Sequence, residues 1–331
     1  MKAFVARGYG GPEVMGLASL PEPEPRGGEV VVDVHAASVN PLDWMLRNGY
    51  LRPRTPLEFP RALGADFAGT VRSVGDDVHG LVPGMPVYGA TEPLQGGNGA
   101  HAERVVVPAG RVHRIPMGLS YEQAAALPVA ALTVLDGLWR CGPVGGKRVL
   151  VNGATGGVGH VAVQVAAARG AVVTAVCRGD HREQALRLGA AGVVDHDAED
   201  FTTGPRRYDV VFDAEGRVDA DSAARVIARG GALVTTLPLE RMGLLAPLRR
   251  LLGGPRIVVA VPRGRDDDYA VLARLVAAGR LKPVVAGVYP LERAGEAFAA
   301  QESGRAVGKV VIQVGEPDVP WPHLVVASRR N

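Results

Sequence analysis

The stretch that decides the fold runs from residue 148 to residue 159 and reads RVLVNGATGGVG. Residues 148–152 are typical of a buried strand, and a glycine-rich turn follows at once, before a helical pattern over 158–169. Glycines allow the backbone to approach a pyrophosphate, whose charge the N-terminus of a helix stabilises. The alternative is a glycine-rich turn between strand and helix that binds no ligand. It stays open because Ala154 replaces the first glycine of the usual G-x-G-x-x-G pattern. The expected cofactor contacts are Gly153, Ala154, Thr155, Gly156, Gly157, Val158 and Gly159.

Short apolar runs recur along the middle of the chain. They lie at 148–152, 171–177, 192–195, 209–213, 231–236 and 256–261, with helical patterns such as 181–188 between most of them. Strands that alternate with helices form a parallel sheet with helices on both faces. The sequence therefore predicts an α/β fold with a doubly wound parallel six-stranded sheet. The first third of the chain has β-branched runs bounded by Pro and Gly, which predicts a separate β-rich domain.

The end of the second predicted strand bears on the choice of dinucleotide. An NAD site would place an acidic residue there, where it binds the ribose 2′-hydroxyl. This chain has Arg178 instead, and Arg182 and His196 could add to a site for a 2′-phosphate. NADPH is therefore favoured over NADH. A simple surface role for Arg178 stays open, as does interference from Asp180.

Composition restricts the function classes. The 331 residues include 37 Lys and Arg against 34 Asp and Glu, and these charges are interspersed, so we expect no nucleic-acid partner. The apolar runs are too short for a membrane span, and the N-terminus lacks a secretory signal, so we expect a soluble cytoplasmic protein. Cys141 and Cys177 are expected as small core residues, and the histidines lack metal-ligand spacing.

With these residues in view, the chain resembles the zinc-independent quinone oxidoreductase branch of the medium-chain dehydrogenase/reductase superfamily. The resemblance covers nearly the whole length, through several motifs in family order. They are Gly11–Met15, His35–Trp44, Leu63–Gly69, Ala130–Thr133, the glycine loop, Val288–Glu292 and Gly308–Val311.

The resemblance implies a GroES-like catalytic domain from residues 1–122 and 263–331, an inserted Rossmann domain over 123–262, and an active cleft between them. It also implies cofactor contacts from Asn40, Thr133, Leu237 and Lys309, and a homodimer. Zinc-dependent relatives hold zinc with a Cys in the first-domain loop and with a Gly-His-Glu motif. Here Asn40 and Gly64-Ala65-Asp66 stand at those places, so no metal is expected.

The implied reaction is hydride transfer from NADPH to a small electron-poor acceptor, either a quinone or an α,β-unsaturated carbonyl compound. By analogy with the family, Asn40 offers an amide donor near the nicotinamide, and Asp43 either orients its loop or forms a simple Asx turn. Tyr50 and His101 are possible proton donors, although a structural role is favoured for each. Water is the alternative proton source.

Two other functions remain open. The first is a discrete enoyl-thioester reductase, for which Arg52, Arg54 and Arg61 could form a basic entrance. The second is an NADPH-binding sensor without catalysis. Met45 keeps the second alternative open, because some relatives have Tyr or Lys at this position, where it assists protonation.

Overall fold

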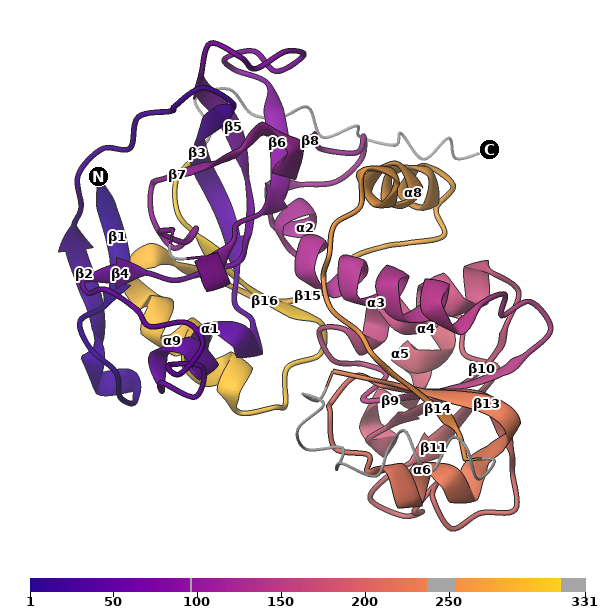
Figure 1. Cartoon of the computed structure of the whole chain (residues 1–331). Helices are drawn as coiled ribbons and strands as arrows, with labels where there is room; N and C mark the ends of the chain where they lie inside the picture. Colours follow the sequence, from indigo (N-terminus) through magenta and orange to yellow (C-terminus); the bar gives the residue numbers. More distant parts are fainter. Residues whose placement is uncertain (96, 237–253, 317–331) are drawn as a thin grey trace, which may run out of the picture. The chain divides into compact units, whose positions relative to one another are not determined.

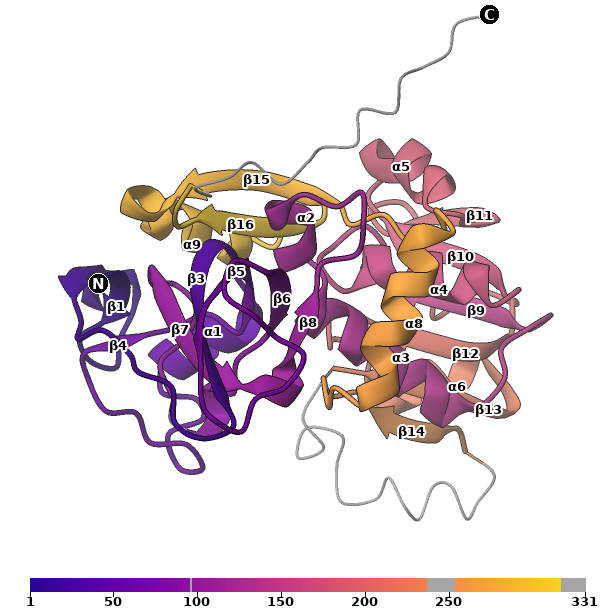
Figure 2. The same cartoon turned by 90° about the horizontal axis from the view of Figure 1, so that it is seen from above.

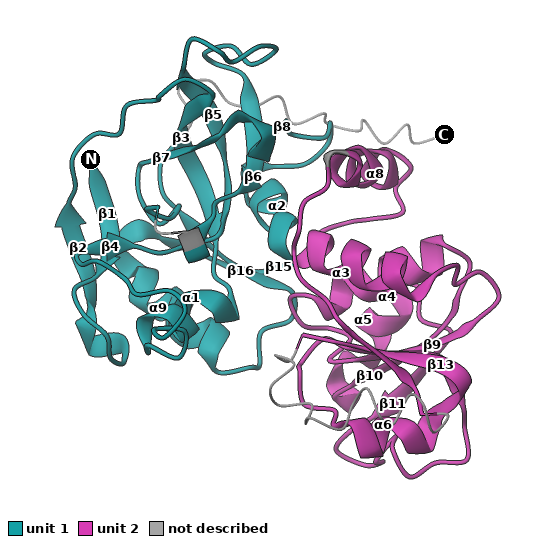
Figure 3. Cartoon of the chain, viewed as in Figure 1, with its two compact units in different colours: residues 1–129, 285–331 teal, residues 130–284 magenta. Residues whose placement is uncertain are grey.

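The computed structural model describes residues 1–95, 97–236 and 254–316, which form two compact units (Figure 1; Figure 3). Unit 1 comprises residues 1–129 and the chain from 285 onward, and unit 2 comprises residues 130–284. The boundaries that the family resemblance implies lie after residues 122 and 262. The segment 263–284 lies in unit 2, where the Arg265 guanidinium stacks 3.9 Å above the ring of Trp139.

Unit 2 is built on a six-stranded parallel sheet in the order β11-β10-β9-β12-β13-β14, which confirms the predicted sheet. The strands are β9 (Arg148–Asn152), β10 (Val172–Cys177), β11 (Gly192–Asp195), β12 (Tyr208–Asp213), β13 (Ile227–Thr235) and β14 (Arg256–Val259). The order reverses beside β9, which pairs with β10 on one side and β12 on the other. Ligands of such sheets bind at the carboxyl ends of the strands at this reversal, where the glycine loop begins.

The described helices that follow or separate these strands are α4 (Gly159–Ala168), α5 (Arg182–Arg187), α6 (Ala220–Val226) and α8 (Asp266–Ala277) (Figure 2). The alanine-rich segment after Ser120 forms two helices, α2 (Tyr121–Ala125) and α3 (Pro128–Cys141). Ser120 caps the first, since its hydroxyl accepts from the Gln123 N–H at 3.2 Å. The helix ends there because Pro128 has no N–H to continue it and suits the first position of a new helix.

Unit 1 contains two sheets and, within the described residues, α2 and two further α-helices. The larger sheet has the order β15-β16-β3-β5-β6-β8, with β7 also paired to β3, and the smaller has the order β2-β1-β4. The elements are β1 (Lys2–Ala6), β2 (Met15–Ser19), β3 (Glu29–Ser38), α1 (Pro41–Arg47), β4 (Arg61–Ala62), β5 (Asp66–Val74), β6 (Pro86–Ala90), β7 (Arg104–Pro108), β8 (Val112–Arg114), β15 (Val285–Pro290), α9 (Ala294–Glu302) and β16 (Lys309–Gln313). This mixed β-rich unit, formed from both parts of the chain, confirms the predicted GroES-like domain.

Strand pairing in the larger sheet determines which polar residues meet. The central strand β3 is antiparallel to both β16 and β5, with Ser38 opposite Val311 on one side and opposite Asp66 on the other. The end of β3 therefore lies beside the starts of β16 and β5. Apolar side chains such as Val32 and Phe67 fill the core below these ends.

Two further expectations concern the whole described chain. Both cysteines are free and buried, as expected for core residues. None of the helices within residues 1–95, 97–236 and 254–316 is long and apolar enough to cross a membrane.

Candidate functional site

The glycine loop between β9 and α4 is closed on itself by backbone contacts. Gly153 has φ +69°, which favours glycine, and a Cβ on Gly159 would lie 1.9 Å from the Gly153 carbonyl oxygen. The Gly156 N–H donates to that oxygen at 3.0 Å, and the Ala154 N–H donates to Val176 O at 3.0 Å. The Ala154 side chain is fully buried. Alanine at this position is therefore compatible with the tight turn.

The loop leads directly into the N-terminus of α4, which is ten residues long. The first N–H groups of a helix have no acceptor within it and carry the positive end of the helix dipole. Gly156, Gly157 and Val158 are half-buried, so this end can be approached from outside the core. Together with the close packing of Gly159 against the Gly153 backbone, these features fit the pyrophosphate of a dinucleotide.

The charged groups after β10 form a mixed cluster. Arg178 is 43% exposed and pairs with Asp180 at 3.0 Å, while its Nε lies 4.0 Å from Asp197. His196 lies 3.2 Å from the same Asp197 carboxylate. Arg182 is exposed at the start of α5. The predicted cationic residues are thus accessible, and Asp180 contacts Arg178 directly.

His181 was not identified from the sequence. Its Nδ1 lies 3.3 Å from the Thr155 hydroxyl, so the segment after β10 contacts the glycine loop. A histidine just after the second strand carries no pattern of its own. Its place beside the loop follows only from the parallel pairing of β9 and β10.

A buried polar cluster lies in unit 1 where β3 ends and β5 and β16 begin. The Asp66 carboxylate is at its centre and is fully buried. Its Oδ2 accepts from Ser38 Oγ at 2.6 Å, from Asn40 Nδ2 at 2.9 Å and from Lys309 Nζ at 3.3 Å. Its Oδ1 accepts from the Val129 N–H at 2.7 Å. Lys309 Nζ also donates to Asn40 Oδ1.

Asp43 connects the loop before α1 to the loop before β5. One oxygen accepts from the Asn40 N–H at 2.7 Å and the other from the Gly64 N–H at 3.0 Å, which agrees with an orienting role. Burial raises the pKa of Asp43 to about 7, although these two N–H groups act to lower it; the nearby Asp66 raises it further, and Lys309 lowers it.

We expect Asp43 to make stability depend on pH between about 4 and 7. In that range the folded protein retains a proton that the unfolded chain, with its ordinary pKa of 3.8, has released. The free energy of unfolding should therefore fall as pH rises, by up to about 4 kcal/mol, and level off above the folded pKa. Urea denaturation of wild type and Asp43→Asn across this range measures the effect. Identical pH dependence in the two proteins would contradict this assignment.

His101 is in the cluster's vicinity, whereas Tyr50 is not. His101 is fully buried, its Nε2 lies 3.3 Å from Ser38 O, and its ring meets Phe298 edge-on. Burial lowers the pKa of His101 to about 4, so the ring is neutral and Nε2–H donates to that carbonyl. Tyr50 is 65% exposed and contacts the ring of Trp44. The structure therefore brings Asn40, Asp43, His101 and Lys309 into one region and leaves Tyr50 on the surface.

The remaining expected residues are distributed as follows. Thr133 is buried in α3, four residues after Val129. Leu237 lies outside the described residues. Arg61 is buried and donates to the carbonyl oxygens of Pro93 and Gly97, so it cannot serve in a basic entrance. Arg52 stacks on the ring of Tyr9.

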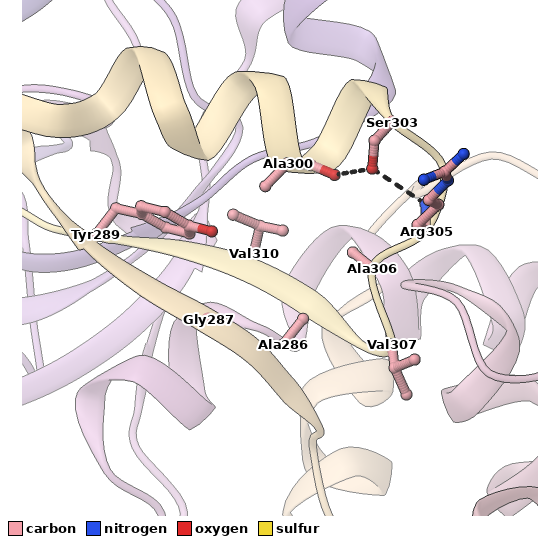
Figure 4. Close-up of a pocket in the computed structure, with 9 residues that line it drawn as sticks. All are labelled: Ala286, Gly287, Tyr289, Ala300, Ser303, Arg305, Ala306, Val307 and Val310. Atoms are coloured by element: carbon pink, nitrogen blue, oxygen red, sulfur yellow. Dashed lines mark hydrogen bonds between the residues drawn. The ribbon is translucent and has the colours of Figure 1, made fainter. Parts of the chain in front are cut away.

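A hollow of about 330 Å³ lies between α9, β15 and the chain leading into β16 (Figure 4). Small side chains such as Ala286 and Ala300 line much of it, and Tyr289 contributes an aromatic ring. Ser303 accepts from the Arg305 N–H at 3.2 Å and donates to Ala300 O at 2.7 Å, which fixes the turn that carries Arg305. No pattern in the sequence predicts this hollow, and Arg305 lies exposed at its edge.

The residues at the expected zinc positions do not suit zinc. Asn40 and Asp66 stand there, and the Lys309 ammonium lies between their oxygens. Zinc sites use thiolate, imidazole and carboxylate ligands, and a fixed ammonium among them would repel the metal. No group of three or more His, Cys, Asp or Glu in the described part of the chain could hold a metal ion. These residues therefore do not form a zinc site.

Comparison with known proteins places these features in a family. Residues 26–117 match the family model described as alcohol dehydrogenase GroES-like domain, and residues 188–312 match the one described as zinc-binding dehydrogenase. An NADPH-dependent alkenal/one oxidoreductase of Arabidopsis thaliana chloroplasts is 35% identical, covering 94% of this chain and 79% of the relative.

Solved structures agree with this result. The quinone oxidoreductase from Coxiella burnetii has a TM-score of 0.86 and 29% identity, covering 95% of this chain and 99% of that chain. A mycobacterial protein solved in complex with NADPH has a TM-score of 0.81 and 27% identity, covering 95% of this chain and all of that chain (100%). This chain therefore belongs to the quinone oxidoreductase branch of the medium-chain dehydrogenase/reductase superfamily.

Proposed function

We propose that the protein is an NADPH-dependent reductase that delivers hydride to a quinone or to an α,β-unsaturated carbonyl compound. The observation that carries this proposal is the glycine loop, closed against the N-terminus of α4 where the strand order reverses. The names of similar proteins, a quinone oxidoreductase and an NADPH-dependent alkenal/one oxidoreductase, support the acceptor class.

The cofactor supplies the hydride, and the residues of this chain bind and orient it. Backbone N–H groups at the start of α4 hold the pyrophosphate, and Arg178 meets the 2′-phosphate with help from Arg182 and His196. Arg178 is half exposed, so its guanidinium can pair with a phosphate in place of Asp180 without breaking a buried ion pair.

The acceptor requires a hydrogen-bond donor where negative charge develops on oxygen. One Nδ2 hydrogen of Asn40 donates to Asp66, which leaves the second for the acceptor oxygen. The neutral, buried His101 is a poor acid at pH 7, and Tyr50 lies apart on the surface. We therefore propose that water supplies the final proton.

We expect Arg178→Glu to reduce the preference for NADPH over NADH by about 10- to 100-fold in kcat/KM. A charge-assisted bond to phosphate contributes about 1.5–3 kcal/mol, and the new carboxylate would repel the phosphate. The matched control is Arg187→Glu, because Arg187 is 71% exposed on α5 and pairs with Glu183 on the surface. If the preference is the same in both variants, Arg178 does not read the 2′-phosphate.

The proposed activity is tested by following NADPH absorbance with an ortho-quinone, a para-quinone, a medium-chain enone and an enoyl thioester. Turnover with a quinone or the enone supports the proposal. Turnover with the thioester alone would assign the protein to biosynthesis. NADPH binding without turnover of any acceptor would overturn the proposed reaction.

We further propose a homodimer in the cytoplasm, on the basis of the family resemblance and the sequence pattern. Light scattering on the purified protein tests the dimer, and fluorescent tagging tests the location.

A further inference from the structure

A buried ion pair stands at the centre of the unit 1 cluster. Asp66 is fully buried and Lys309 is 4% exposed, and their charged atoms lie 3.3 Å apart. Removing two such charges from water costs several kcal/mol each, and apolar residues of similar size often stabilise a protein equally well. Stability alone therefore gives little reason to place this pair here.

The contacts of the pair determine the orientation of one amide. Lys309 carries only donors and Asp66, when ionised, only acceptors. Lys309 Nζ therefore fixes the position of Asn40 Oδ1, and Asp66 Oδ2 fixes the position of Asn40 Nδ2 at 2.9 Å. A flipped amide would place its NH₂ group against the ammonium and its oxygen against the carboxylate. The ion pair thus allows only one orientation of Asn40.

The same carboxylate also binds the backbone of α3. Asp66 Oδ1 accepts from the Val129 N–H at 2.7 Å, at the first turn of the helix that carries Thr133. Ser38 donates to Asp66 Oδ2 at 2.6 Å and completes its set of partners. One buried carboxylate therefore fixes both the amide of Asn40 and the start of α3.

We propose that Asp66 and Lys309 are positioning residues that hold the Asn40 amide ready to donate to the acceptor oxygen. The proposal rests on the reductase activity proposed above. The pair acts through the Asn40 amide, which Asp66 and Lys309 contact at opposite ends. A misplacement of about 1 Å at a reacting group can cost about 100-fold in rate.

The decisive variant is the double replacement Asp66→Asn with Lys309→Met, which removes both charges together. We expect near-normal thermal stability, an unchanged dissociation constant for NADPH and a kcat lowered about 10- to 100-fold. The kinetic isotope effect with 4-deuterated NADPH should rise, because hydride transfer becomes more rate-limiting. The single variants leave one buried charge unpaired and should unfold more easily.

Two further variants keep the test interpretable. Ser38→Ala serves as the test if the double variant fails to fold. It removes one donor to Asp66 without unpairing a charge, and should lower kcat about threefold. Arg47→Met is the control, because it breaks another ion pair of unit 1, between the buried Arg47 and Glu302 at 2.8 Å, and the Glu302 side chain is 26% exposed. It should lower the melting temperature and leave kcat unchanged.

The outcomes separate the two proposals. If wild type reduces no acceptor, the proposed function fails and this inference fails with it. If wild type is active but the double variant keeps the wild-type kcat and isotope effect, the positioning role alone is overturned. Where the double variant does not fold, the same result for Ser38→Ala overturns it. Loss of turnover with stability and NADPH affinity retained supports it.

Discussion

Gly159→Ala is expected to weaken NADPH binding by at least about 100-fold. The added Cβ would lie 1.9 Å from the Gly153 carbonyl oxygen and 2.9 Å from Ala154 Cα. Both atoms belong to the backbone, so no side-chain rotation can relieve the clash. The loop must move away from the start of α4, and the N–H groups there then no longer converge on the pyrophosphate.

Fluorescence titration with NADPH measures this effect, and thermal denaturation reports whether the variant remains folded. The matched control is Gly192→Ala in β11, where an added Cβ would meet nothing within 4 Å. This control should bind NADPH as wild type does. A folded Gly159→Ala protein with unchanged affinity would show that the loop is not the cofactor site.

Local patterns were sufficient to predict the sheet of unit 2. All six predicted apolar runs form strands, although β13 begins at Ile227, four residues before its predicted run, and includes Arg229 and two glycines. The glycine loop could be located because the strand, the turn and the helix are consecutive in sequence. Such signals depend on neighbours along the chain, and these are visible without a structure.

The polar cluster of unit 1 shows what the sequence alone could not provide. Lys309 lies 269 positions from Asn40, and no local pattern connects them. Antiparallel pairing of β3 with both β5 and β16 brings Lys309, Asn40 and Asp66 together. The family resemblance suggested a cofactor contact for Lys309, and the structure shows that its ammonium contacts protein oxygens.

The second domain boundary shows a related difficulty. The pattern over residues 266–279 predicts a helix, but a helical pattern does not say which sheet or helix it packs against. Asp136 on α3 is 2% exposed and lies 3.4 Å from Arg265 at the start of α8. This contact between distant residues keeps α8 within unit 2.

Asn40→Ala is the second variant for which we expect a large effect, a fall in kcat of about 100- to 1000-fold. Removal of one donor to a developing oxyanion has a cost of this size when the donor is preorganised and shielded from water. Asn40 is 3% exposed and its amide is held at both ends. The KM for NADPH should change little, since the donor acts on the acceptor.

The control for this variant is Asn48→Ala, at the other end of α1, where the side chain accepts only from Arg47 among the described contacts. It should retain the wild-type kcat. If Asp66 and Lys309 act only through Asn40, replacing both in the Asn40→Ala background should lower kcat little further, because residues that act as a unit are not additive. Full additivity would instead show that the ion pair and the amide contribute to turnover independently.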